Sequence, residues 1–191
     1  MKKKRFKRWF VLLAALLVIL FVVVPKIAHK IECTRYPQKY SESVEKWAAE
    51  YQIDPNILYA VIRTESSFNP QAESNVGARG LMQMTEETFH WIKSKITSQE
   101  PLDFDSLYDP DTSIRFGAYF MDQCMERYNG DLSTAAAAYH SGWGTVDKLL
   151  DDAAYTSDGI TLSEYPYPQM NRYVYKINRS YQKYVSLYGA Q

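Results

Sequence analysis

The chain has 191 residues, which is enough for one domain and a short additional segment. Charged residues make up 23% and hydrophobic residues 46%, a composition typical of a packed domain that excludes a disordered chain. The formal net charge is zero, but eight of the 22 basic residues precede residue 32, so residues 32–191 carry 14 basic and 22 acidic side chains. Because such an acidic domain would repel phosphates, we expect no nucleic-acid partner.

The first 28 residues have the pattern of a membrane anchor. Six of residues 1–8 are Lys or Arg, and Trp9–Val24 contains sixteen residues without a polar group. As a helix this run spans about 24 Å, and its extension to residue 28, with Lys26 reaching toward water, approaches the bilayer core of roughly 30 Å. The sequence therefore predicts a cytoplasmic basic segment over 1–8 and a transmembrane anchor over 9–28. The remainder of the chain would lie on the extracytoplasmic side of the cell membrane.

A cleaved signal peptide is the alternative to an anchor. Lys26 stands where a cleavage site requires a small residue, which disfavours that reading. A lipoprotein signal is also disfavoured, because Lys30–Glu32 before Cys33 is not a run of apolar and small residues. Export would permit a disulfide between Cys33 and Cys124, and two free thiols remain the other possibility.

The rest of the chain is predicted to be a linker over 29–40 and a single, mostly helical domain over 41–188. Asp54-Pro55 and Asp109-Pro110 are both pairs of a cap and a first-turn residue. The expected helices cover 42–51 after a Ser41 cap, 56–65, 86–95 after a Thr85 cap, 110–128, from Ser133 or Thr134 to 140, 145–151, and 168–188. The sequence lacks alternating strand pairs joined by hairpin turns, so the predicted fold class is all-α.

The sequence lacks the residue patterns that most classes of catalytic site require. His29, His90 and His140 are far apart and form no metal-binding motif, so we expect no metal and no cofactor. A nucleophilic-serine motif and a phosphate-binding loop are also missing. Cys124 lies in the middle of a predicted helix, where a thiolate nucleophile is unfavourable. The remaining candidate for catalysis is a carboxylate side chain.

Glu65 is the carboxylate that stands out. It ends the predicted helix over 56–65 and continues the apolar stripe formed by Leu58, Val61 and Ile62. A carboxyl group on such a stripe is partly desolvated, which raises its pKa and lets it act as a general acid near neutral pH. The alternative is a helix-terminal glutamate that simply turns toward solvent.

The segments that follow Glu65 resemble the lytic transglycosylase SLT family, relatives of goose-type lysozyme. Residues 65–74, ESSFNPQAES, and 77–84, GARGLMQM, match its pattern E-S-x-x-N-x-x-A-x-S…G-A-x-G-L-M-Q. Further segments that resemble the family follow in its order: 108–117, 138–144 with the sequence AYHSGWG, 165–167 and 172–174. The resemblance covers about residues 41–185 and implies a lysozyme-like, all-α fold.

The resemblance also implies roles at matching positions. Glu65 would be the sole catalytic acid and base, with Ser74 beside it to place or polarise the carboxyl group. Gly80 and Gln83 would line the sugar groove, and Met82 would pack beneath it. The residues implied to contact or shape the substrate site are Ser74, Gly80, Met82, Gln83, Tyr139, His140 and Tyr173.

Two of these implied roles concern tyrosine hydroxyl groups. Tyr139 would point its hydroxyl toward the catalytic carboxyl, and Tyr173 would approach that carboxyl from the last helix. His140 stands where the family usually has Asn, and it could supply a second titrating group near the site. A substitution with no effect on substrate is the alternative for His140.

The implied activity is that of a membrane-anchored peptidoglycan lytic transglycosylase, whose partners are the glycan strands and, through the N-terminal helix, the membrane. It would cleave the β-1,4 bond between N-acetylmuramic acid and N-acetylglucosamine and form a 1,6-anhydro end. One carboxyl group would suffice because the substrate's own 6-hydroxyl is the nucleophile, whereas glycosidases usually need two carboxylates. The alternatives are a hydrolytic muramidase, a catalytically weak glycan-binding module of an envelope-spanning machine, and a purely structural membrane protein.

Overall fold

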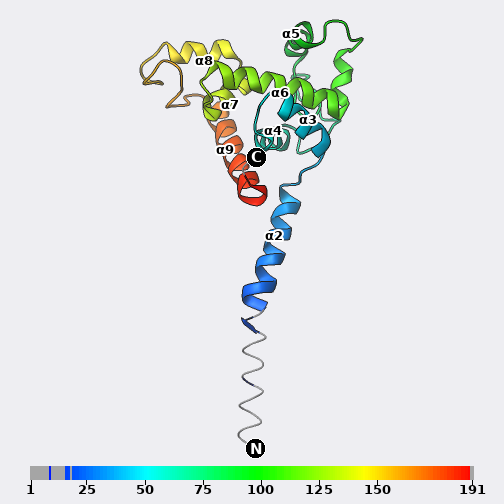
Figure 1. The fold of residues 1–191 in the computed structure, drawn as a ribbon. Coiled ribbons are helices and arrows are strands. Elements are labelled where there is room, and N and C mark those ends of the chain that lie inside the picture. Colours follow the sequence, from blue (N-terminus) through cyan, green and yellow to red (C-terminus); the bar gives the residue numbers. More distant parts are fainter. Residues whose placement is uncertain (1–8, 10–15, 18, 190–191) are drawn as a thin grey trace, which may run out of the picture. The chain divides into compact units, whose positions relative to one another are not determined.

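The computed structural model describes residues 9, 16–17 and 19–189 of the chain. The chain divides into two compact units, Met1–Pro37 and Gln38–Gln191, and each is described by itself. The helical elements of the described residues are shown in Figure 1. They are η1 (Ile19–Val23), α2 (Val24–Arg35), α3 (Ser41–Glu50), α4 (Pro55–Glu65), α5 (Glu86–Ile96), η2 (Phe104–Tyr108), α6 (Pro110–Arg127), α7 (Leu132–Ser141), α8 (Trp143–Leu150) and α9 (Pro168–Tyr188).

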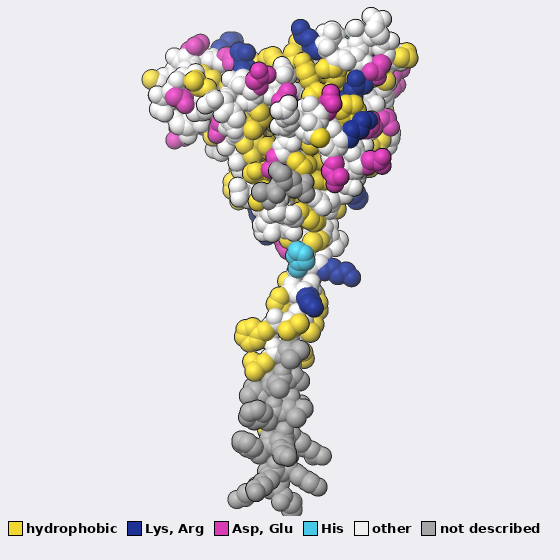
Figure 2. Space-filling view, viewed as in Figure 1, with side chains coloured by type: hydrophobic (Ala, Val, Ile, Leu, Met, Phe, Trp, Pro, Cys, Tyr) yellow, Lys and Arg dark blue, Asp and Glu magenta, His cyan; other side chains and the backbone are white. Residues whose placement is uncertain are grey.

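The first unit contains η1, a π-helical turn, followed by α2. The large apolar side chains of η1 and α2 are exposed, including those of Phe21, Val24 and Ile27, whereas Tyr36 after α2 is buried. Figure 2 shows yellow hydrophobic atoms along this part of the chain. Within the part of the chain that the structure describes, we find no helix with both the length and the apolar character needed to cross a bilayer. The expected basic segment over 1–8 and much of the expected anchor over 9–28 lie outside the described residues.

The segment predicted to be a linker, residues 29–40, is helical in its first part. The α2 helix continues as far as Arg35, with Tyr36 as the C-cap. Cys33 lies in this helix, and its Sγ contacts the Nε2 atom of His29 at 3.6 Å. Cys33 and Cys124 are both free thiols in the structure.

The second unit is built around two long helices, α6 and α9. The α9 helix packs against α4 and α7, and α7 in turn packs against α6. The α3 helix contacts both α4 and α6, so the core lies among these five helices (Figure 1). The all-α prediction is confirmed for the described residues, where the only β-type pairings are two isolated bridges, from Arg79 to Glu73 and to Met84.

Helix starts in this unit follow from side-chain caps. Asp54 accepts a hydrogen bond from the backbone N–H of Asn56 at 2.8 Å, and a proline follows as the first helical residue of α4. Asp109 caps α6 in the same way, and Thr85 caps α5. These three predicted starts are confirmed, and the Asp54 cap matters for function because α4 ends at Glu65.

Other helix starts differ from the predictions. Ser41 is the first residue of α3 and not its cap, which is Tyr40 in a left-handed conformation with φ of 59°. The α7 helix begins at Leu132 and not at Ser133 or Thr134, because Asp131 caps it and accepts the Thr134 N–H at 2.7 Å. The α8 helix begins at Trp143, two residues before the predicted start, and η2 was not predicted.

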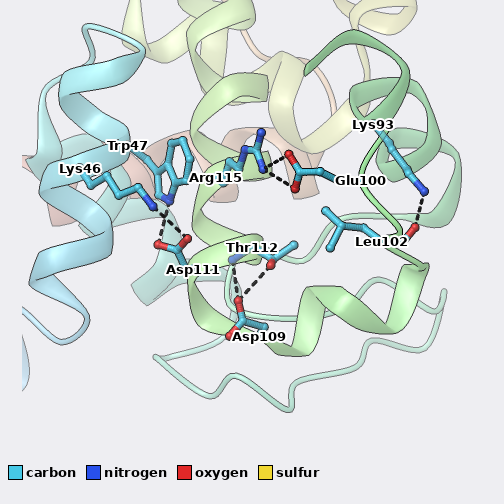
Figure 3. Close-up of polar contacts among 9 residues, drawn as sticks. All are labelled: Lys46, Trp47, Lys93, Glu100, Leu102, Asp109, Asp111, Thr112 and Arg115. Atoms are coloured by element: carbon cyan, nitrogen blue, oxygen red, sulfur yellow. Dashed lines mark hydrogen bonds and ion pairs between the residues drawn. The ribbon is translucent and has the colours of Figure 1, made fainter. Parts of the chain in front are cut away.

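Polar contacts fix the outer surface of α6 to its neighbours (Figure 3). Lys46 and Trp47 of α3 both donate to the Asp111 carboxylate, at 3.3 and 2.9 Å. Arg115 donates to both oxygens of Glu100 at 2.9 Å, which ties the loop after α5 to the same helix. These contacts hold α3, α6 and the residue 97–102 segment in one frame.

Candidate functional site

Glu65 lies at a cavity of about 260 Å³ in the second unit. The cavity is bounded by the end of α4, the loop between α4 and α5, and parts of α5, α6 and α7. Glu65 is the one acidic side chain among the described residues that line it. Its lining residues are Glu65, Ser74, Val76, Ala78, Gln83, Met84, Thr85, Thr88, Phe120, Tyr139 and His140.

Glu65 is positioned by the apolar stripe of α4. Leu58, Val61 and Ile62 are fully buried, and the carboxyl group that follows them is partly buried. Burial raises the pKa of Glu65 to about 7, while the Tyr173 hydrogen bond and the positive charge of Lys176 act in the opposite direction. The side chain can therefore hold or release a proton near neutral pH, as a general acid and base requires.

Tyr173 reaches this carboxyl group from α9, as the family resemblance implies. Its hydroxyl donates a hydrogen bond of 2.5 Å to Oε1 of Glu65. Burial, followed by the charge of Glu65, raises the pKa of Tyr173 well above its ordinary value, so the phenol remains a neutral donor. This hydrogen bond stabilises the carboxylate form of Glu65.

Tyr139 lines the cavity, but its hydroxyl has a different partner from the one expected. It donates to the backbone carbonyl oxygen of Met82 at 2.8 Å, and not toward the Glu65 carboxyl. The Tyr139 ring is buried and lies 5.1 Å from the ring of Phe120, measured between centroids. Tyr139 thus joins α7 to the loop that precedes α5 and forms part of the cavity wall.

The loop between α4 and α5 is held in shape by its own side chains. The Ser74 hydroxyl accepts the Ala78 N–H at 3.0 Å. The Gln83 side chain donates to the carbonyl oxygens of Ala72 and Gly80, both at 3.0 Å. Ser74 and Gln83 both line the cavity, so two of the implied substrate residues also maintain the loop that carries them.

Gly80 and Met82 belong to the same loop but are absent from the cavity lining. A Cβ atom on Gly80 would lie 2.0 Å from the carbonyl oxygen of Leu107 and 2.7 Å from the Ser113 hydroxyl, so this glycine permits close packing on η2 and α6. Met82 is fully buried and packs against Gly117 of α6, as the resemblance implies. For Gly80 the structure therefore differs from the expectation of a groove-lining residue.

His140 lies near the end of α7 and lines the cavity with an exposed ring. The ring stacks on Tyr173 with a centroid distance of 4.5 Å and an angle of 12° between the planes. Partial burial lowers the pKa of His140 below its ordinary value, so the ring is mainly uncharged at neutral pH.

Several lining residues were not singled out from the sequence, among them Val76, Thr85, Thr88 and Phe120. Thr85 was recognised only as a cap, and its hydroxyl lies 2.9 Å from that of Thr88. In the part of the chain that the structure describes, no group of three or more His, Cys, Asp or Glu side chains is placed to hold a metal ion.

A comparison with protein families matches residues 42–158 to the family described as "Transglycosylase SLT domain". The chain belongs to this family. The match contains Glu65 and every lining residue of the cavity, which confirms the resemblance read from the motifs. It ends before α9, so the SLT match does not include Tyr173.

Similar proteins carry related names. The chain is 37% identical over 112 residues to "Transglycosylase" of Enterobacteria phage PRD1, covering 56% of this chain and 38% of that protein. It is 28% identical over 188 residues to "Membrane-bound lytic murein transglycosylase C" of Yersinia pestis, covering 87% of this chain and 52% of that protein. The chain thus spans about half or less of the length of these relatives.

Solved structures share the fold of the SLT domain. The inactive mutant of lytic transglycosylase Slt from Pseudomonas aeruginosa, in which a glutamate is replaced by glutamine, has a TM-score of 0.70 and 28% identity. That match covers 83% of this chain and 26% of the other. The 70-kDa soluble lytic transglycosylase from Escherichia coli has a TM-score of 0.75 at 24% identity, covering 83% of this chain and 26% of that chain.

Proposed function

We propose that this chain is a peptidoglycan lytic transglycosylase that cleaves the β-1,4 bond between N-acetylmuramic acid and N-acetylglucosamine and forms a 1,6-anhydro end. The observation that carries the proposal is the Glu65 carboxyl, which lies at the wall of a cavity and whose pKa burial raises to about 7. The described residues that line this cavity include no second carboxylate. Membership of the SLT family and the names of the relatives support the same activity.

The reaction uses Glu65 twice. Protonated Glu65 donates its proton to the glycosidic oxygen, and the bond from that oxygen to C1 of the muramic acid breaks. The 2-acetamido oxygen of the substrate stabilises the positive charge that develops at C1. The Glu65 carboxylate then takes the proton of the 6-hydroxyl group while the oxygen of that hydroxyl group bonds to C1. Water is therefore not consumed.

The hydrogen bond from Tyr173 and the burial of Glu65 each support one half of this cycle. The hydrogen bond stabilises the carboxylate that forms after the first proton transfer, and burial keeps the pKa of Glu65 high enough for the proton to be present beforehand. A carboxyl group poised near pH 7 serves as acid and base with little loss in either role.

The other implied substrate residues act by contact and shape. Ser74, Gln83 and His140 line the cavity and present polar atoms to the sugars, while the Tyr139 ring supplies an aromatic wall. Met82 and Gly80 do not line the cavity, and their packing against α6 determines how closely the loop approaches that helix.

Product analysis tests the proposal. The full chain in detergent is incubated with purified peptidoglycan, and the released muropeptides are measured by mass spectrometry. We expect 1,6-anhydro ends from the wild-type chain and a loss of about 10²-fold or more with Glu65→Gln, which preserves shape but cannot transfer the proton. Glu50→Gln is the matched control, because Glu50 is an exposed glutamate that also ends a helix.

Three other outcomes would contradict the proposal. Products one water heavier, with free reducing ends, would identify a hydrolytic muramidase. Binding of glycan without release of products would identify a glycan-binding module. Wild-type turnover by a folded Glu65→Gln variant would remove Glu65 from the mechanism.

We also propose that residues 9–28 anchor the chain in the cell membrane, with residues 41–188 on the extracytoplasmic side. The basic residues before Trp9, the apolar run to Val24 and the exposed side chains of Ile19–Val24 support this arrangement. The test adds protease to right-side-out membrane preparations. We expect digestion of residues 41–188 and a membrane-bound N-terminal stub, whereas a soluble mature form lacking residues 1–28 would indicate cleavage.

A further inference from the structure

The catalytic carboxyl of the proposed function is connected to His140 through one intermediate ring. His140 of α7 stacks on Tyr173 of α9 with nearly parallel planes, 12° apart, and a centroid distance of 4.5 Å. Tyr173 donates to Glu65 of α4 at 2.5 Å. Three helices thus meet in a series of contacts that runs from the exposed His140 ring to the carboxyl group.

The direction of the Tyr173 hydroxyl depends on how its ring is held. A phenol can rotate about the bonds that join it to the backbone, and a tilt of the ring moves the hydroxyl away from its acceptor. Parallel aromatic stacking restricts that motion, because the favourable contact is lost when the planes tilt. His140 can therefore restrain Tyr173 without touching Glu65 itself.

We propose that His140 is a positioning residue, whose ring holds the phenol of Tyr173 in line with the Glu65 carboxyl. The inference rests on the proposed function, since it assigns the effect of His140 to the general acid of that reaction. It also separates two contributions of His140, the stack on Tyr173 and any contact with substrate in the cavity.

Charge on His140 is not required for this role. The titratable or charged groups near the stack are Glu65 of α4, Cys124 of α6, Tyr139 of α7, and Tyr173 and Lys176 of α9. Burial raises the pKa of the Cys124 thiol to about 12, so it remains uncharged. Both tyrosines remain neutral because burial raises their pKa values well above the ordinary range. Burial lowers the pKa of His140, so at neutral and alkaline pH an uncharged imidazole makes the contact.

The pH profile distinguishes a positioning role from a general structural one. The hydrogen bond from Tyr173 lowers the pKa of Glu65, so its misalignment raises that pKa further. Because the first step needs protonated Glu65, the decline of kcat at high pH would then shift to higher pH. A simple loss of folded protein would lower kcat at all pH values without moving this decline.

The experiment measures kcat and KM for peptidoglycan digestion by the full chain in detergent across the pH range. We expect His140→Ala to lower kcat by about 2- to 10-fold, the equivalent of one aromatic pair, and to shift the alkaline decline to higher pH. We expect His140→Phe, which retains an aromatic ring without titration, to keep the alkaline decline at the wild-type pH. The matched control is His90→Ala, which removes an exposed histidine from α5.

A double-mutant cycle tests whether His140 acts through Tyr173. We expect Tyr173→Phe to shift the alkaline decline to higher pH, and His140→Ala to add little to that shift in the double variant. Additive effects would overturn the proposal, as would an unmoved profile in His140→Ala or a shifted one in His140→Phe. Because each variant retains Glu65, these outcomes are distinct from the inactive Glu65→Gln that tests the function itself.

Discussion

Tyr173 and Glu65, 108 residues apart in the sequence, are joined by a hydrogen bond of 2.5 Å from the phenol to Oε1 of the carboxyl group. The bond and the surrounding burial have opposite effects on the same proton. Burial favours the neutral acid, and the donated hydrogen bond favours the carboxylate. The result is a carboxyl group whose pKa of about 7 makes both forms accessible under ordinary conditions.

The first prediction concerns the pH dependence of activity. We expect the rate of peptidoglycan cleavage to fall as pH rises through about 7, because the acid form of Glu65 is lost. Lys176→Gln removes a positive charge that lowers the pKa of Glu65, so this decline should move to higher pH, most clearly at low salt. Lys148→Gln, an exposed substitution on α8, serves as the control. A decline that stays in place or moves to lower pH in Lys176→Gln would contradict the prediction.

The second prediction concerns stability. The pKa of Glu65 is raised from 4.5 to about 7 on folding, so the folded chain binds this proton more tightly than the unfolded chain. The resulting stability is fully present below pH 4.5 and is lost as pH rises through 7. At pH 8 the charged carboxylate therefore destabilises the fold, by an amount on the order of 1 to 3 kcal/mol.

Thermal unfolding followed by circular dichroism checks this. Glu65→Gln should unfold at a higher temperature than the wild-type chain at pH 8, and the two curves should converge near pH 4. Glu50→Gln, at the exposed end of α3, should show no such pH-dependent gain. A Glu65→Gln variant that is less stable at pH 8 would show that the carboxylate is well accommodated in the folded state.

The third prediction compares two glycines in one loop. Gly77 and Gly80 have φ values of +79° and +77°, but only Gly80 would bring a Cβ atom against a backbone oxygen, that of Leu107 at 2.0 Å. Gly77→Ala should cost about 1 kcal/mol from its left-handed conformation alone. Gly80→Ala should cost roughly 2 kcal/mol more, because the loop and η2 must separate. Urea unfolding measures both, and equal losses would mean that the close contact is relieved without cost.

The fourth prediction compares two buried tyrosine hydroxyl groups. Tyr139→Phe removes the donor to the Met82 carbonyl and should lower the free energy of unfolding by about 1 to 2 kcal/mol. The hydroxyl of Tyr59 is buried with no hydrogen-bond partner among the described residues. Tyr59→Phe should therefore be neutral or slightly stabilising. A similar loss in both variants would indicate that the hydrogen-bonded hydroxyl of Tyr139 contributes no more than the unbonded hydroxyl of Tyr59.

Local backbone chemistry explains which helices could be predicted. A cap followed by proline specifies a helix start without help from distant residues, so Asp54 and Asp109 were assigned correctly. The start of α7 was missed, because Asp131, Ser133 and Thr134 are all good caps and only the packed structure selects Asp131. Local signals therefore predict the all-α class correctly, whereas the helix boundaries that differ from the prediction depend on packing.

The candidate site also contains residues whose place the local sequence predicts and residues whose place it does not. The place of Glu65 on the buried stripe of α4 follows from helical periodicity and was predicted from residues within the same helix. The Tyr139 hydroxyl could not be assigned, because its acceptor is a backbone carbonyl in a loop 57 residues away. The close packing of Gly80 likewise depends on η2, which no sequence pattern indicated.

The late position of α9 has a consequence for the newly made chain. On the ribosome, α4 is synthesised more than a hundred residues before Tyr173, so Glu65 first exists as an ordinary solvated carboxyl group. The hydrogen bond that Tyr173 donates to it forms only when the last helix has been made and has docked. A recombinant fragment ending at residue 158, where the family match ends, would retain the motifs up to that residue. It would lack α9 and therefore the hydrogen bond from Tyr173 to Glu65.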